Sequence, residues 1–519
     1  MDKKMLLALG GMIIAAMTTD LNEALTSILL PNISGGLGIG ADQSSWFNTI
    51  YGAAEIIGMA VSPWFAVTFS IRRWAIGVIL TTAFSSALIP LVGNVTLVFI
   101  LHGIQGLCGG LTIPLLMATA LRALAPPIRL IGLACYALTA SFFPNLAMAV
   151  AALWSGVGDS PLGWPFAFYE ALPFSVLAAV LVWYGMIQDP INLRRFKKFN
   201  WRGFLLAVAG LAAFVIVLEQ GDRLDWFNSP LICVLSLVAC VCVPLFLLNE
   251  WFQETPFIKL QMLNRRNLSY ALITLFGFLI VGQAASTVPA MYLQEVQNLL
   301  PAQSYLITLE IAASQLILLP FLVWLLDIEP LDARIVALIG KLCMLGACIG
   351  SSFLTVVWQR DQFYLWQGLA SLGEAMVIMP LLMQATNIVK PEEGPYAAAL
   401  INTPRALSSA VSVWLLNLIQ SWRGGLHSTR LTDQLGQERF RVLQGYGVLP
   451  SYPPAFMPNG ATRAPDSLAQ LYTSLNQQVS VLTISDIYLV LAGIALFLIV
   501  LVFVLPERSA PPRIALMKK

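Results

Sequence analysis

Charged residues are scarce in this chain of 519 residues: they make up 11% of it, against about 25% in an ordinary soluble domain. Hydrophobic residues make up 58%. A water-soluble core could not bury so large an apolar fraction, so we expect a protein whose solvent is the lipid bilayer. The net charge of +2 gives no indication of a nucleic-acid partner, and we expect none.

Histidine and cysteine do not form a pattern that could bind a metal. There are two histidines and seven cysteines, and Cys240 and Cys242 would point to different faces of a helix, which predicts neither a disulfide framework nor a metal site. A phosphate-binding loop is missing too, because the one Gly-Lys pair, Gly340-Lys341, has Ile335 where the upstream glycine should stand. We therefore expect no cofactor, exclude ATP as the energy source and favour a proton gradient.

A membrane-length window divides the chain into fourteen apolar stretches of about twenty residues each. Lys and Arg fall almost entirely into alternate connections, as expected for a chain threaded back and forth through a bilayer. The sequence predicts an all-α polytopic membrane protein with both termini on the cytoplasmic side. The predicted spans are 5–32, 44–68, 74–96, 97–123, 129–154, 166–188, 203–220, 229–249, 268–292, 304–326, 333–357, 363–388, 396–420 and 484–505.

A basic cluster at 190–202 separates six spans from eight. A weak internal sequence repeat supports a duplicated six-helix unit, because Gln105-Gly106 and Pro114 in span four match Gln367-Gly368 and Pro380 in span twelve. Chance similarity between Leu-rich helices is the alternative. The predicted organisation is a six-helix half at 1–189, a cytoplasmic linker at 190–202, two inserted helices at 203–250, and a second half at 268–519 that includes an outer loop at 421–483.

Several stretches carry a resemblance to a known family. They are Leu29-Leu-Pro-Asn-Ile33, Gln105-Gly106 with Pro114, Leu218-Glu-Gln-Gly-Asp-Arg-Leu-Asp-Trp-Phe-Asn-Ser229, Pro256-Phe-Ile-Lys-Leu260 and Leu293-Gln-Glu-Val296. With them the whole chain resembles the fourteen-span drug:proton antiporter branch of the major facilitator superfamily, and within it the EmrB-type pumps. The resemblance implies a fold of two six-helix halves plus two inserted helices, a bacterial inner-membrane location, proton-coupled drug export, a periplasmic adaptor protein and an outer-membrane channel.

The sequence also departs from that family at its coupling positions. The acid of the first span falls on Asn22, with Asp20 and Glu23 on either side of it, and the arginine of the fourth span is replaced by His102. The glycine-rich motif of the fifth span keeps only its proline, Pro144. The resemblance therefore implies the fold more firmly than it implies the coupling residues.

Ionisable groups inside apolar spans carry the functional signal, because a charge at the bilayer centre costs about 2.5–3.5 kcal/mol and persists where it faces a cavity or a partner. Asp20 and Glu23 stand three residues apart and so share one helical face. For each acid the alternative is a hydrogen-bonded carboxyl that joins helices, and for His102 a neutral core residue. Glu219 and Asp486 lie near span ends, where we expect solvent. The proton-coupling candidates are Asp20, Glu23, Glu55, His102, Glu310 and Glu374.

Polar and aromatic residues in the spans indicate a substrate path. Arg405 does not lose its proton and suits a counter-charge to an acid or to an anionic substrate, and Pro404 beside it predicts a broken helix. Aromatic residues such as Trp46 and Tyr51 suit planar or amphipathic compounds, with simple packing as the alternative. The substrate-binding candidates are Asn22, Trp46, Tyr51, Gln105, Phe143, Tyr292, Gln367 and Arg405.

These observations favour a proton-coupled exporter of hydrophobic or amphipathic small molecules such as drugs. An exporter of an endogenous metabolite, such as a siderophore or a lipid, is the alternative within the same class. An intramembrane transferase that uses His102 is a weaker alternative, because no second histidine or paired nucleophile lies in a span. We therefore expect that the protein is not an enzyme.

The long connection at 421–483 needs a function of its own, because helix connections are commonly about two to eight residues long. Apolar residues at near-helical spacing predict an amphipathic helix on the outer surface at 427–443, and a second helix is expected at 467–478. Gly and Pro make the middle, 445–458, unsuited to regular structure. We expect this loop to dock the adaptor protein.

Overall fold

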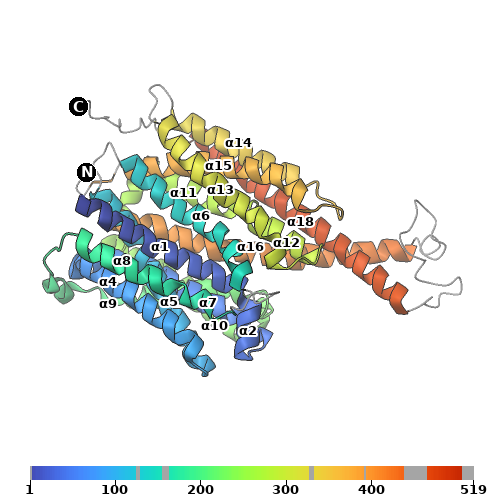
Figure 1. Cartoon of the computed structure of the whole chain (residues 1–519), viewed down its shortest axis with the longest axis horizontal. Helices are drawn as coiled ribbons and strands as arrows, with labels where there is room; N and C mark the ends of the chain where they lie inside the picture. The colour runs from blue at the N-terminus through green and yellow to red at the C-terminus, as the bar shows by residue number, and fades with distance from the viewer. Residues whose placement is uncertain are drawn as a thin grey trace.

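The computed structural model describes residues 3–123, 129–154, 163–326, 332–387, 389–390, 393–437 and 465–504, and within these ranges the chain is helical without strands. The helices form an elongated bundle, in which α1 begins and α18 ends at the same end (Figure 1). This confirms the predicted all-α polytopic fold.

The first six predicted spans are formed by eight helices, because two of the spans are interrupted. The break between α1 and α2 falls at Leu29, two residues before Pro31, whose ring removes a helical hydrogen bond. The second break separates α7 from α8 at Glu170. The helices are α1 (Lys3–Ile28), α2 (Leu30–Leu37), α3 (Ala41–Phe69), α4 (Ile71–Leu88), α5 (Val95–Ala123), α6 (Arg129–Trp154), α7 (Phe166–Tyr169) and α8 (Ala171–Gly185).

The remaining helices form the predicted inserted pair and the second set of spans. The ninth predicted span consists of two helices, α11 and α12, separated by turns at residues 283–286. The helices are α9 (Trp201–Gln220), α10 (Pro230–Phe252), α11 (Arg266–Gly282), α12 (Thr287–Glu295), α13 (Pro301–Leu326), α14 (Ala333–Ser351), α15 (Arg360–Asn387), α16 (Gly394–Gln437) and α18 (Pro465–Val504).

In the described part of the chain, thirteen segments are long and apolar enough to cross a membrane. They match thirteen of the fourteen predicted spans. The other predicted span, 396–420, lies within α16, where Asn402, Arg405 and several serines lower the mean hydropathy. α16 nevertheless packs within the bundle, against α3, α5, α9, α11 and α18.

Glycines let α3 and α5 approach each other closely. A Cβ atom added to Gly110 would lie 1.9 Å from the carbonyl oxygen of Glu55, and one added to Gly106 would lie 2.4 Å from that of Tyr51. Small residues of this kind allow two membrane helices to pack backbone against backbone. The contact fixes the part of α3 that carries Glu55.

Contacts between early and late helices join the two ends of the chain. α6 packs along α13, and α3 packs along α16. The hydroxyl of Tyr136 on α6 donates a hydrogen bond to Oδ1 of Asn402 on α16, at 2.5 Å. Helices from both predicted halves therefore surround the centre of the bundle.

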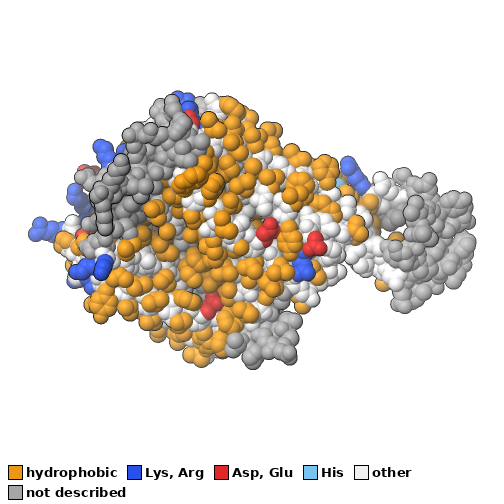
Figure 2. All heavy atoms as spheres, turned by 45° about the horizontal axis from the view of Figure 1, so that its top comes forward, with side chains coloured by type: hydrophobic (Ala, Val, Ile, Leu, Met, Phe, Trp, Pro, Cys, Tyr) orange, Lys and Arg blue, Asp and Glu red, His pale blue; other side chains and the backbone are white. Residues whose placement is uncertain are grey.

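The outer surface has the distribution of side chains expected for a protein in a bilayer. Apolar side chains cover the middle of the visible face, and most visible Lys and Arg side chains gather at the end where α1 begins (Figure 2). α10 exposes Val234, Leu237 and Leu245 and packs mainly on α9. The inserted pair thus adds to the periphery of the bundle through α9.

Ion pairs link Glu393, in the connection that precedes α16, to two basic residues in the connection that precedes α11. Lys259 Nζ lies 3.1 Å from Glu393 Oε1, and Arg265 Nη2 lies 2.8 Å from Glu393 Oε2. Burial tends to raise the pKa of Glu393, but the two neighbouring cations outweigh burial and hold that pKa below its ordinary value. Glu393 is therefore ionised at neutral pH, which keeps both ion pairs in place.

One expectation about α16 is wrong: Pro404 does not break its helix, since α16 is continuous around it and loses only the hydrogen bond that proline cannot donate. The two helices predicted in the long connection are helical where the structure describes them, 427–437 at the end of α16 and 467–478 within α18, which starts at Pro465. They continue the membrane spans rather than forming separate helices, and 438–443 lies outside the described residues. Both helices project beyond the rest of the bundle (Figure 1), and we call residues 421–437 and 465–483 the stalk. The predicted irregular stretch 445–458 lies outside the described residues.

Candidate transport cavity

A cavity of about 600 Å³ lies at the centre of the bundle. Its walls come from α1, α3 and α6 on one side and from α11, α12, α13, α15 and α16 on the other. Early and late helices therefore share it, as the predicted path between two halves requires. Its size lies within the range of small-molecule sites.

Six ionisable side chains line this cavity: Asp20, Glu23, Glu55, Glu295, Glu374 and Arg405. All but Glu295, at the end of α12, are candidates from the sequence, and the six come from five helices. Arg405 Nη2 lies 3.4 Å from Asp20 Oδ2, and their side chains are 16% and 3% exposed. The pair links α16 to α1 across the cavity.

Arg405 keeps capacity for a further partner. Its Nη1 atom is buried and has no hydrogen-bond partner among the described residues. A buried guanidinium donor without an acceptor is unfavourable, so an anionic group or water in the cavity would be stabilised there. The hydroxyls of Ser408 and Ser412, one and two turns along α16, line the same wall but donate to backbone carbonyls of their own helix.

Glu374 enters the cavity at the break between α11 and α12. A Cβ atom added to Gly282 would lie 3.4 Å from Glu374 Oε1, so the end of α11 packs directly on this carboxyl. Gln283, Ser286 and Thr287 follow and also line the cavity. A non-helical turn at membrane depth is tolerated where it lines such a space, and it supplies polar groups to a ligand.

Apolar side chains form the rest of the wall. Met59, Met148 and Met291 come from three different helices, and Phe278 and Ile378 lie with them. Methionine is flexible and polarizable, so such a wall adapts to compounds of different shape. An apolar wall next to carboxyls and a guanidinium is suited to binding an amphipathic molecule.

His102 lies outside this cavity. It is fully buried, its ring stacks on Phe47 at 3.8 Å between centroids, and Tyr51 lies 5.1 Å away. Its Nδ1 atom is 3.0 Å from Oε1 of Gln105, whose Nε2 donates to Ser86 Oγ at 2.7 Å. His102 and Gln105 therefore belong to a packed polar contact between α5 and α4, which is the core alternative considered for the histidine.

Several other candidates are held by hydrogen bonds away from the cavity. Asn22 donates to the Ala167 carbonyl at 3.1 Å, and Gln367 donates to the Ala285 carbonyl at 2.8 Å. These bonds join helices, as expected for buried amides. Tyr292 likewise donates its hydroxyl to the Thr355 carbonyl, at 2.6 Å.

Three more candidates, from helices α3, α6 and α13, lie outside the lining of the central cavity. Trp46 borders a separate, mostly apolar hollow between α3 and α5. Phe143 packs edge-on against Phe142, and Glu310 packs on Gly368 with its Oε2 atom buried and without a partner among the described residues. These residues do not line the central cavity.

Glu219 is the ionisable residue that the sequence interpretation misplaced. It was expected in solvent, but it lies against α3, where a Cβ atom added to Gly52 would be 3.3 Å from its Oε1 atom. This contact could not be predicted because Glu219 stands near the end of a span, next to polar Gln220, where an acidic side chain usually faces solvent. The signal available in the sequence was the stretch from 218 to 229, which carries the most specific part of the resemblance.

No group of His, Cys, Asp and Glu side chains within the described ranges could hold a metal ion. The seven cysteines are unpaired thiols. What the cavity offers chemically is therefore proton exchange at carboxyls, a fixed cation at Arg405, and an adaptable apolar wall.

Comparisons with known proteins identify the fold and the family. The sequence profile of the Major Facilitator Superfamily matches residues 12–413. The chain belongs to this superfamily and so is a membrane transporter.

The relatives include multidrug export and resistance proteins. The chain is 24% identical over 512 residues to the multidrug export protein EmrB of Escherichia coli (strain K12), covering 93% of this chain and 92% of that protein. It is 24% identical over 428 residues to the fatty acid resistance protein FarB of Neisseria gonorrhoeae, covering 80% of each. The resemblance noted in the sequence to the EmrB-type pumps is confirmed.

Solved structures support the same fold. The human organic anion transporter MFSD10 superposes with a TM-score of 0.57 at 12% identity, covering 95% of this chain and 100% of that one. The proton:xylose symporter XylE superposes with a TM-score of 0.52 at 12% identity, covering 98% of each. At such identities the likeness concerns the fold alone.

Proposed function

We propose that this protein is an antiporter that exports hydrophobic or amphipathic small molecules, drugs among them, in exchange for protons. The observation that carries the proposal is the shared cavity in which five carboxyls and one arginine face an apolar wall. The multidrug export and fatty acid resistance proteins among its relatives support efflux as the direction of transport.

Proton exchange at the carboxyls would couple the two fluxes. Asp20 and Glu23 share one face of α1, and Glu55 lines the cavity from α3. Like charges this close do not all ionise readily, so a proton is retained until a cation or a conformational change replaces it. One proton that moves inward across 100 mV releases about 2.3 kcal/mol, which is enough to drive an uphill efflux step.

Arg405 would act as the fixed counter-charge. Its ion pair with Asp20 holds α16 and α1 together, and protonation of Asp20 would weaken that pair and release the guanidinium. The same guanidinium can bind an anionic headgroup, so a fatty acid is a second cargo class that the site can hold. Export of an endogenous lipid or siderophore would use the same chemistry.

We further infer a bacterial inner-membrane location with both termini in the cytoplasm, and partnership with a periplasmic adaptor and an outer-membrane channel. The basic connections support the orientation. The stalk supports the partnership, because it extends two neighbouring helices beyond the bundle at the end opposite to the start of α1 (Figure 1).

Gradient-driven transport by the purified protein in proteoliposomes tests this proposal. With an acidic lumen, the wild-type protein should accumulate ethidium, a planar aromatic cation, and Glu23→Gln should reduce this uptake about a hundredfold because the amide cannot carry a proton. Ethidium exchange at equal pH should stay near the wild-type rate. Glu254→Gln, an exposed carboxyl paired with Lys198, is the matched control.

A pH gradient that drives neither ethidium nor a long-chain fatty acid through the wild-type protein would contradict proton antiport of this kind. If the pH gradient drives uptake of the fatty acid but not of ethidium, proton coupling is supported and the cargo class is anionic amphiphiles.

A further inference from the structure

The inserted helix α9 brings a carboxyl to the helix that carries Glu55. Glu219 lies on the last turn of α9 and packs on Gly52, which stands three residues, or about one turn, before Glu55 on α3. Glycine at position 52 leaves room for the carboxylate, because a methyl group there would come within 3.3 Å of Glu219 Oε1. Glu219 therefore approaches the central carboxyls from outside the two six-helix sets.

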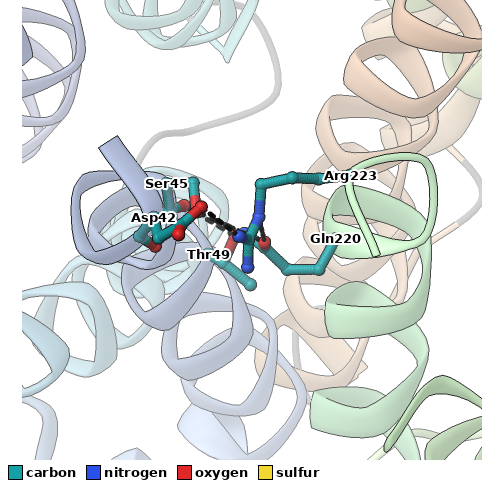
Figure 3. A network of polar contacts seen from close by, with 5 residues as sticks. All are labelled: Asp42, Ser45, Thr49, Gln220 and Arg223. Atoms are coloured by element: carbon teal, nitrogen blue, oxygen red, sulfur yellow. Dashed lines mark hydrogen bonds and ion pairs between the residues drawn. The ribbon is translucent and has the colours of Figure 1, made fainter. Parts of the chain in front are cut away.

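A network of polar contacts holds this end of α9 against α3 (Figure 3). Gln220 donates to Thr49 Oγ1 at 2.7 Å and to the Ser45 carbonyl at 3.0 Å. Arg223 donates from Nε to Gln220 Oε1 at 2.7 Å and from Nη1 to Asp42 Oδ1 at 3.0 Å. Both ends of the Gln220 amide are satisfied, so its orientation is fixed.

The depth of the network matters for the carboxyl next to it. Asp42 has a side chain that is 93% exposed, whereas Gln220 and Thr49 are 2% and 1% exposed. The contacts thus run inward along α3 from solvent at Asp42 to the buried Gln220 and Thr49. Glu219, next to Gln220, is partly buried and packs on Gly52, which stands one turn before Glu55.

Charges on the elements around Glu219 define its electrostatic surroundings. Glu23 on α1 and Glu55 on α3 each interact electrostatically with Glu219. The charged groups around it include Asp42 and Glu55 on α3, Asp20 and Glu23 on α1, Arg405 on α16, and Asp222 and Arg223 directly after α9. Acids outnumber bases here, which favours a shared proton over full ionisation.

We propose that Glu219 is a proton-carrying member of the central carboxyl cluster, placed there by the inserted helix. A proton from solvent at the Asp42 end binds the Glu219 carboxylate and moves on to the carboxylate of Glu55 or Glu23, which leaves Glu219 ionised and its acceptor neutral. Gln220 and Arg223 are positioning residues in this scheme. The inserted helix pair thereby has a role in coupling, and this inference rests on the proposed proton antiport.

Transport by Glu219→Gln in the full-length protein is the direct test. Ethidium uptake driven by an acidic lumen should fall about tenfold or more, while ethidium exchange at equal pH should stay near wild type, because the amide removes the proton and keeps the size of the side chain. Asp225→Asn is the matched control, since its carboxyl lies nearby in the same connection and bonds Asn228 at 2.8 Å. Gradient-driven uptake by Glu219→Gln within about twofold of wild type would overturn the proposal.

Labelling with dicyclohexylcarbodiimide separates this proposal from the proposed function. The reagent enters apolar regions and adds to protonated carboxyls, so Glu219 of the wild-type protein should be modified at pH 6 and much less at pH 9, with Asp225 unmodified at both. Peptide mass spectrometry reads out the site without any cargo. Labelling of Glu219 that is the same at both pH values, or that is missing at both, would also overturn the proposal. Failure of wild-type ethidium transport with pH-dependent labelling intact would count against the cargo and leave the proton site standing.

Discussion

Charge compensation at single residues determines which of the intramembrane groups can act together. Asp20 and Arg405 are 385 positions apart in the chain and meet across the cavity at 3.4 Å. The sequence predicts that each is placed for function, because a charge in an apolar span is unfavourable unless it is compensated. It does not predict that they are partners, since only the tertiary fold places α1 and α16 on facing walls of one cavity.

The ion pair makes a prediction about stability at this scale. Asp20→Asn leaves the Arg405 guanidinium buried without its carboxylate and should lower the unfolding free energy by about 3–5 kcal/mol. Thermal unfolding of the purified protein in detergent measures the effect, with Asp225→Asn as the control. Adding Arg405→Gln to Asp20→Asn should restore much of the loss, because no unpaired charge remains. A double variant as unstable as Asp20→Asn alone would contradict the pairing.

His102 and Glu219 show why the site could be predicted only in part. The resemblance implied a coupling role for position 102, but the stacking of its ring on Phe47 is a tertiary contact with no signal in the sequence. Glu219 stands near a span end, where solvent is the usual environment, and only the docking of α9 on α3 partly buries it. Five of the six ionisable cavity residues, Asp20, Glu23, Glu55, Glu374 and Arg405, could be predicted because a charged residue inside an apolar span is recognisable from the sequence alone.

Helix ends were the least predictable feature at the scale of elements. Apolar runs predict the membrane-spanning part of a helix, but α16 and α18 continue as polar helices into the stalk, where hydropathy gives no boundary. The contacts that stabilise this continuation lie at its base, where Arg423 Nε and His427 Nε2 are each 2.6 Å from Asp486 Oδ2. These contacts also correct the expectation that Asp486 is simply solvated.

The base of the stalk also contacts the cavity wall. Gln420 of α16 donates to Glu295 at the end of α12, and Gln477 of α18 donates to the Val296 carbonyl at 3.0 Å. α12 lines the cavity along its length, with Met291 and Glu295 among the lining residues. A movement of α12 would therefore reach the stalk through direct contacts.

Removing the outer part of the stalk tests its role. Replacing residues 431–473 with a short Gly/Ser linker keeps the contacts of Arg423 and His427 with Asp486, so folding and ethidium transport in proteoliposomes should stay near wild type. Drug resistance of intact cells should be lost, since the adaptor would no longer dock. Equal loss of transport in both assays would assign the stalk to folding or gating, and full resistance in cells would remove it from adaptor docking.

The described part of the molecule places an early and a late set of helices around a polar cavity, with α9 and α10 beside them and the stalk at one end. Basic connections, apolar spans and the similarity of the stretches around Gln105 and Gln367 predict the spans and their grouping from the sequence, because each reflects a membrane constraint that acts locally along the chain; they do not predict the stalk. The register in which α6 meets α13 and α3 meets α16 is set by packing over hundreds of residues, and no local pattern specifies it.

Proton flux driven by a cargo gradient tests proton antiport through the shared cavity most directly. Proteoliposomes that contain the wild-type protein and the pH-sensitive dye pyranine start with equal pH inside and outside, with the membrane potential clamped by potassium and valinomycin. When ethidium is added outside, antiport predicts that its inward movement expels protons and that the internal pH rises. The rise should be absent with Glu23→Gln. Ethidium uptake by the wild-type protein without any change of internal pH would contradict the account.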